Sequence, residues 1–128
     1  MNEQKRKRLE AAGWKVGTVR EFLGLTEEEA AFVELKLALA RSVKLWRSAR
    51  RLSQKSLAKL LGSSQSRVAK MEAADPTVSV DLLIRSLLAL GARRTDLASV
   101  IRLRKPEDVR RLPIRRHPAS ARLRELRA

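Results

Sequence analysis

The sequence predicts an all-α protein, and three kinds of observation support this fold class. Apolar residues recur three and four positions apart in several segments, which is the spacing of one face of an α-helix. Serine or threonine precedes these segments, where a hydroxyl can accept amide hydrogens that the first helical turn leaves unpaired. Glycines follow several of them, where a helix often ends with a left-handed residue. We therefore expect a helical domain with a helical N-terminal appendage and a basic C-terminal tail.

The stretch that begins at Ser53 reads as two short helices joined by a tight turn. Ser53 can cap the first helix, and Gly62 can end it. Ser64 can cap the second helix, whose inward-facing residues are Val68 and Met71. The first helix carries an apolar stripe made of Leu57, Ala58, Leu60 and Leu61. Helices this short are not stable alone, so the two must cross closely.

This pattern resembles the helix-turn-helix unit of the Cro and phage-repressor family, also called XRE. Turn, core and polar positions agree together: Gln54, Leu57, Ala58, Leu61, Gly62, Ser63, Gln65, Val68, Met71 and Glu72. The resemblance extends with less detail over residues 34–101, and it implies a lambda-repressor-like helical DNA-binding domain. An αα-hairpin in an unrelated helical bundle is the alternative interpretation.

The outer face of the second short helix is expected to read DNA bases. With Val68 pointing inward, a helical wheel places a serine, a lysine and two alanines on the far side. Lysine can donate to guanine O6 and N7, and glutamine can pair with adenine N6 and N7. The family resemblance implies that the base readers are Gln65, Ser66 and Lys70. A solvated helix face is the alternative for Ser66 or Lys70 taken singly.

The same resemblance implies contacts to the DNA backbone. Arg67 lies at the phosphate edge, Gln54 resembles the family's phosphate clamp, and Thr77 and Ser79 lie where the family's loop meets phosphate. The expected DNA-binding residues are therefore Gln54, Ser64, Gln65, Ser66, Arg67, Lys70, Thr77 and Ser79.

Glu72 is expected to stabilise the domain and not to face DNA. The helical wheel turns its carboxylate back towards the scaffold, away from phosphates that would repel it. In the family a basic residue of the first helix pairs with this position, and Arg47 is the matching residue here. We therefore expect a partly buried ion pair between Arg47 and Glu72.

A long helix is predicted before this unit. Thr26 and Glu29 fit a capping box, and the helix should run to about Arg50. One stripe suited to the domain core comprises Phe32, Leu35, Leu39, Val43 and Trp46. A shorter helix from Thr18 should end near Gly24. The upstream half of the long helix is apolar around much of its circumference, so other residues must cover it. The candidates are a second chain or an N-terminal fold-back of Trp14, Val19, Phe22 and Leu23.

Two helices and a tail are predicted after the unit. Ser79 should cap the first helix, which carries Leu82, Leu83, Leu87 and Leu90 and ends at Gly91. Thr95 should cap the second, with Leu97, Val100 and Ile101 facing inward. Residues 102–128 hold ten basic and three acidic residues and three prolines, so they should be extended or disordered. The expected domains are an arm with a short helix (1–29), the DNA-binding domain (30–101) and the tail (102–128).

Composition limits the possible functions. The net charge of +15 points to a polyanionic partner, whereas the aromatic content of 3% is low for stacking single-stranded nucleic acid. The chain has no cysteine and one histidine, so zinc fingers and thiol catalysis are not expected. No apolar run approaches the roughly 20 residues that span a bilayer. No phosphate-binding glycine loop or catalytic motif is present. We expect a cytoplasmic, nucleoid-associated protein that is not an enzyme and that needs no cofactor or metal.

Two functional classes remain from the sequence. The first is a sequence-specific regulator of double-stranded DNA that acts as a homodimer on a pseudo-palindromic operator. The second is the antitoxin and autorepressor of a type II toxin–antitoxin pair, because the chain resembles HigA-type antitoxins, whose partners are RelE- or HigB-like ribonuclease toxins. Surplus apolar residues and acidic residues within 14–37 favour such a protein partner. A stand-alone phage-type or XRE repressor is the alternative, and a general RNA-binding protein is a more distant one.

Overall fold

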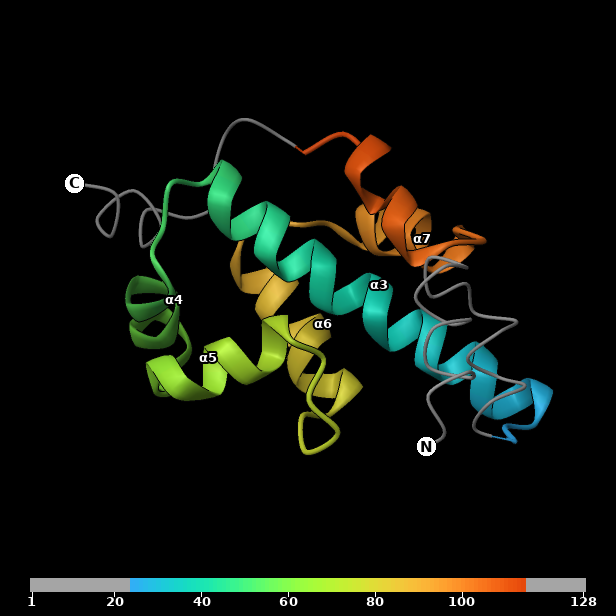
Figure 1. The fold of residues 1–128 in the computed structure, drawn as a ribbon. Helices are drawn as coiled ribbons and strands as arrows, with labels where there is room; N and C mark the ends of the chain where they lie inside the picture. The colour runs from blue at the N-terminus through green and yellow to red at the C-terminus, as the bar shows by residue number, and fades with distance from the viewer. Residues whose placement is uncertain (1–23, 115–128) are drawn as a thin grey trace, which may run out of the picture. The chain divides into compact units, whose positions relative to one another are not determined.

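The computed structural model describes residues 24–114, and every regular element in that range is helical (Figure 1). The elements are α3 (Glu27–Ala49), α4 (Gln54–Leu61), α5 (Gln65–Glu72), α6 (Val80–Ala89), α7 (Arg94–Arg102) and the 3-10 helix η1 (Pro106–Arg111). The all-α fold class is thus confirmed. The described residues belong to two units, 24–34 and 35–114. Within the described range no helix is long and apolar enough to cross a membrane.

The predicted helix starts agree with the structure at four positions. The Glu29 N–H donates to Thr26 Oγ1 (3.1 Å), and the Thr26 N–H donates to Glu29 Oε1 (3.4 Å), which completes the capping box of α3. Three serine hydroxyls, those of Ser53, Ser64 and Ser79, each accept the N–H of the residue three positions later. The predictions for the short helix from Thr18 and for the N-terminal fold-back lie outside the described residues.

The two short helices end in the same way. Gly62 follows α4 with φ 66°, and the Ser63 N–H donates back to the Ala58 carbonyl (2.8 Å). Ala74 follows α5 with φ 54°, and the Asp75 N–H donates to the Lys70 carbonyl (3.0 Å). This is the Schellman arrangement, which pairs carbonyls that the last turn would otherwise leave open. The left-handed turn at Gly62 lets α5 cross α4 closely.

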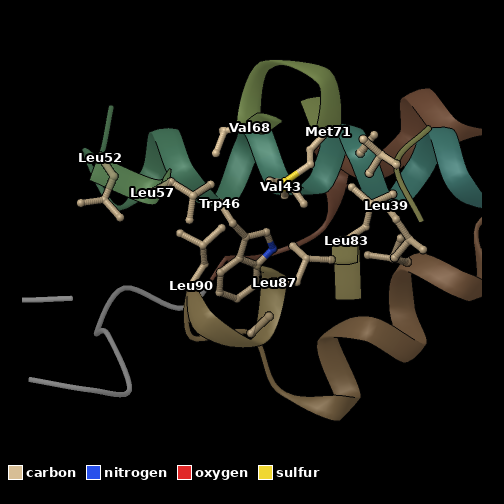
Figure 2. Packing of buried hydrophobic residues seen from close by; sticks show 14 of the residues in the cluster. Leu39, Val43, Trp46, Leu52, Leu57, Val68, Met71, Leu83, Leu87 and Leu90 are labelled. Carbon is tan, nitrogen blue, oxygen red and sulfur yellow. The ribbon is translucent and has the colours of Figure 1, made fainter. Parts of the chain in front are cut away.

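The core lies where α3, α4, α5 and α6 meet, and its side chains point towards one another (Figure 2). From α3 it takes Leu39, Val43 and Trp46, from α4 Leu57, from α5 Val68 and Met71, and from α6 Leu83 and Leu87, with Leu90 directly after α6. Val68 and Met71 are fully buried, as predicted. Because α5 is only two turns long, these two anchors fix which of its faces remains exposed.

Arg50 is an unexpected part of this core. Its side chain is 1% exposed, and its Nε donates to the Leu90 carbonyl at the end of α6 (2.9 Å). Its guanidinium carbon lies 5.1 Å from the centre of the Trp46 ring, within the range of a cation–π contact. From the sequence, Arg50 is expected only to end the long helix. In the structure it joins the C-terminal end of α3 to that of α6.

Three predictions for inward-facing or capping residues are wrong. Phe32 is 54% exposed and Ile101 is 55% exposed, although both fit an apolar stripe. Periodicity identifies the residues that share a helix face, but it does not show how far along the helix the covering partner extends. Thr95 does not cap α7, because the helix already begins at Arg94. The Asp96 carboxylate accepts the Arg93 N–H (2.7 Å) and supplies the cap instead.

The prediction of an extended or disordered tail from residue 102 is wrong for residues 103–114. This segment contains η1, in which Pro106 and Val109 are buried. Val109 is 4% exposed and belongs to the core cluster, against which Leu103, Leu112 and Ile114 also pack. The segment is basic, so its composition resembled that of a disordered chain, but its few apolar residues are placed to reach the core. The remaining residues of the predicted tail, 115–128, lie outside the described range.

We predict that Val109→Ala lowers the free energy of unfolding by about 1–3 kcal/mol, because it removes buried methyl groups and leaves a cavity. Ile101→Ala should change it by less than about 0.5 kcal/mol, because this side chain is mostly in solvent. Chemical denaturation of the full chain measures both values. Equal effects of the two substitutions would contradict the burial of η1 against the core.

Candidate nucleic-acid interface

The outward face of α5 is exposed, small and cationic. Ser64 caps the helix by accepting the Arg67 N–H at 3.2 Å, and its hydroxyl also lies 3.3 Å from that of Ser66. The exposed residues on and beside α5 are Ser64, Gln65, Ser66, Arg67, Ala69, Lys70 and Ala73. Since Val68 and Met71 hold the opposite face in the core, these side chains point away from the domain. The predicted base readers Gln65, Ser66 and Lys70 therefore share one accessible surface.

The carboxylate of Glu72 is turned away from that surface and forms the predicted pair with Arg47. Arg47 Nε donates to Glu72 Oε2 at 2.6 Å, and a second guanidinium nitrogen donates to Oε1 at 3.0 Å. The two side chains are 14% and 5% exposed, so this is a largely buried, bidentate pair. The hydrogen bond to Glu72 raises the pKa of Arg47 above its ordinary value, and burial opposes this effect. Arg47 therefore keeps its positive charge beside the Glu72 side chain.

Two further hydrogen bonds extend this pair to the start of α4. Arg47 donates to the Leu52 carbonyl (2.8 Å), which lies just before Ser53. The Gln54 side-chain amide donates to Glu72 Oε1 (3.1 Å). The Arg47–Glu72–Gln54 network thus joins α3, the first residue of α4 and the last residue of α5. The ion pair was predicted, but the bond from Gln54 was not, because no local sequence pattern indicates a contact between residues 18 positions apart.

Gln54 occupies a position from which it can meet a phosphate. It is the first residue of α4, where backbone N–H groups have no partner inside the helix. Ser53 accepts only the Ser56 N–H (3.0 Å), so the N–H groups of the first two helical residues remain available. A helix N-terminus with free donors favours an anion. The bond to Glu72 holds the Gln54 side chain at this end of the helix.

The loop after α5 contains the two predicted phosphate contacts, Thr77 and Ser79, and they differ in their hydrogen bonds. Thr77 donates both its N–H (2.8 Å) and its hydroxyl (2.6 Å) to Asp75 Oδ1. Both bonds hold the pKa of Asp75 below its ordinary value, and the bond from the Thr77 hydroxyl has the larger effect. The Thr77 hydroxyl hydrogen is therefore committed to a carboxylate, which itself repels phosphate. Ser79 instead accepts the Leu82 N–H (3.1 Å) and keeps its own hydroxyl hydrogen for a further acceptor.

Lys36 is a residue of this region that was not predicted from the sequence. Its Nζ donates to the Pro76 carbonyl (3.4 Å) and so joins α3 to the loop. A lone lysine on a helix face carries no sequence signal for such a contact across 40 positions. As for other chemistry, no group of three or more His, Cys, Asp or Glu residues in the described part of the chain could hold a metal ion.

Comparison with protein families supports this geometry. A family model described as a helix-turn-helix domain matches residues 22–95, which is more than half of the chain. The chain belongs to this helix-turn-helix family. The match contains α4, the turn at Gly62 and α5, and it ends before η1. No curated protein and no solved structure matches the chain. In helix-turn-helix domains the second helix of the unit enters the DNA major groove, and that helix is α5 here.

We predict that Arg47→Met destabilises the helix-turn-helix domain by about 3–5 kcal/mol, because it leaves the Glu72 carboxylate buried without its partner. The double variant Arg47→Met/Glu72→Gln should recover part of this loss, since neither charge is then buried. A double-mutant cycle on the free energy of unfolding measures the coupling. A coupling energy near zero would show that the pair does not hold α3 to α5.

Proposed function

We propose that this protein is a transcription regulator that binds a specific sequence of double-stranded DNA by placing α5 in the major groove. The observation that carries the proposal is the orientation of α5. Its cationic and polar side chains are exposed, whereas its one carboxylate is 5% exposed and paired with Arg47. A helix that met a polyanion would need this separation of charges. The net charge of +15 adds a long-range attraction to DNA.

The residues of the α5 surface suit direct readout of bases. Ala69 and Ala73 have short side chains, so the helix backbone can approach the groove floor closely. Lys70 can donate to guanine O6 and N7, and Gln65 can make a paired contact with adenine. Ser66 can bond either to a base or to its neighbour Ser64, which lies 3.3 Å away. Each good paired contact contributes about 1–3 kcal/mol of discrimination between bases.

Phosphate contacts would fix the position of α5 in the groove. The N-terminus of α4 at Gln54, the Ser79 hydroxyl and the Arg67 side chain are the donors that we assign to this role. Phosphate contacts orient a protein on DNA without reading its sequence. We do not assign this role to Thr77, because its hydroxyl donates to Asp75. Binding as a homodimer to a pseudo-palindromic operator would double the readout, as is usual for helix-turn-helix proteins.

We predict that Gln65→Ala and Lys70→Ala each relax base preference at one position by about 1–3 kcal/mol. Selection of the full chain against a random duplex library should first give a preferred site. Lys59→Ala is the control, because it also removes one positive charge from an exposed position, on α4, and it should leave the preference unchanged. Equal binding of the wild-type chain to every duplex would refute the proposed function.

We further propose, as a second role, that the protein is the antitoxin of a toxin–antitoxin pair and represses its own operon. The supporting observation is the start of α3, where Phe32 is 54% exposed close in sequence to the acidic residues Glu27, Glu28 and Glu29. An exposed aromatic ring beside carboxylates is a suitable contact for a basic protein. Ribonuclease toxins of the RelE or HigB type are basic partners of this kind. A stand-alone repressor is the alternative, and it needs no such contact.

The antitoxin role predicts that co-expression with a small toxin encoded next to this chain rescues growth. Phe32→Ser should weaken the affinity of the complex with the toxin by about tenfold or more, and so reduce the rescue of growth, because it removes an exposed aromatic anchor. Leu88→Ser, at a second exposed apolar residue (46%) on α6, is the matched control and should not weaken it. Absence of any neutralised protein, with DNA selectivity intact, would leave the stand-alone repressor as the function.

A further inference from the structure

Residues outside the matched helix-turn-helix region form a groove against α3. The groove is open, has a volume of about 590 Å³, and lies between α3, the end of α5 and η1. Its walls are made of Arg41, Lys44, Leu45, Glu72, Glu107, Val109 and Arg110. Val109 is buried in the core and therefore fixes the wall that η1 supplies. The groove exists because residues 103–114 fold onto the domain and do not form a free tail.

The charges in this groove do not cancel. Glu72 is committed to Arg47 and Gln54. Glu107 lies 3.7 Å from Arg41, in a half-exposed ion pair that also links η1 to α3. Within residues 24–114 neither Lys44 nor Arg110 forms an ion pair, and Arg110 makes only a long hydrogen bond to the Glu107 carbonyl (3.4 Å). Two exposed cations on opposite walls are thus left without a carboxylate partner.

The groove borders the C-terminal end of α5, because Glu72 is the last residue of α5 and also part of the groove wall. The Glu72 carboxylate itself is held by Arg47 and Gln54, so it does not face the duplex. A duplex whose major groove holds α5 also carries its phosphate backbones past the two ends of that helix. Those backbones present one negative charge about every 1.7 Å of helix axis. In the proposed complex, these phosphates are the anions that Lys44 and Arg110 can meet.

We propose that Lys44 and Arg110 bind phosphates of the DNA backbone outside the base pairs that α5 reads, so that the groove lengthens the DNA footprint. This inference rests on the proposed function for the placement of the duplex. The charge, the open shape and the border with α5 favour nucleic acid over an acidic protein segment. The groove would contribute affinity but no base preference, because phosphate contacts carry no sequence information.

The test compares the full wild-type chain with the double variant Lys44→Gln/Arg110→Gln on two duplexes. The short duplex contains only the selected site, from the first to the last base pair for which the wild-type chain shows a preference, and the long one adds about ten base pairs, or one helical turn, on each side. The logarithm of the binding constant is measured against the logarithm of salt concentration. Each phosphate contact contributes about 0.9 to this slope. The double variant should lose about 2 from the slope on the long duplex, should lose nothing on the short one, and should keep its base preference.

Arg111→Gln is the matched control, because Arg111 is exposed in the same 3-10 helix but does not line the groove. It should leave both slopes unchanged. An unchanged long-duplex slope in the double variant would overturn the proposal, as would an equal loss in Arg111→Gln, which would indicate a general charge effect. Binding of poly-glutamate, a model of an acidic protein segment, is measured as well. If the double variant loses this binding but keeps its long-duplex slope, the groove binds an acidic protein instead. If the wild-type chain shows no base preference, the proposed function fails, but the slopes on any long and short duplex still decide the role of the groove.

Discussion

The buried contact between Arg47 and Glu72 is the interaction on which the rest of the domain depends. Removing two charges from water is costly, and this cost is offset only when geometry and hydrogen bonding are good. Here the pair is bidentate, Arg47 makes a further bond to the Leu52 carbonyl, and Glu72 accepts a further bond from Gln54. Since Arg47 is on α3, Gln54 on α4 and Glu72 on α5, the correct crossing of three helices is required to satisfy it.

The same network buries the carboxylate of α5 and leaves the cations of this helix exposed. Glu72 is the acidic residue of α5, and an exposed carboxylate there would oppose any polyanion. Turning it into the domain leaves Lys70 and Arg67 to determine the sign of the outer surface. The network also holds Gln54 at the N-terminus of α4, where free backbone N–H groups favour an anion. One buried ion pair therefore orients two candidate contacts to nucleic acid.

The segment after α7 packs against the core of the domain. Residues 103–114 lie beyond the family match, yet Val109 completes the core and Arg110 faces an open groove on α3. A charged segment with few apolar residues usually remains disordered because it cannot bury enough surface. This segment is ordered because it need not build a core of its own and only has to add Val109, Leu112 and Ile114 to an existing one. It thereby brings cations next to the helix that we propose reads DNA.

Local interactions explain what the sequence by itself determined. The caps at Thr26, Ser53, Ser64 and Ser79 act over three residues, and the inward orientation of Val68 and Met71 follows from helix periodicity alone. These features were predictable because the partners lie within one or two turns of each other. The ion pair of Arg47 with Glu72 was predictable only through family resemblance.

Tertiary structure decided the features that join distant segments. Arg50 contacts the Trp46 ring and the Leu90 carbonyl, Lys36 contacts the loop at Pro76, and Val109 joins the core, but none of these contacts leaves a local pattern. Phe32 and Ile101 show the converse, because each fits a helical stripe yet remains more than half exposed. A stripe specifies which face of a helix is apolar. Whether that face is covered depends on where other parts of the chain pack, which is set by the whole fold and not by neighbouring residues.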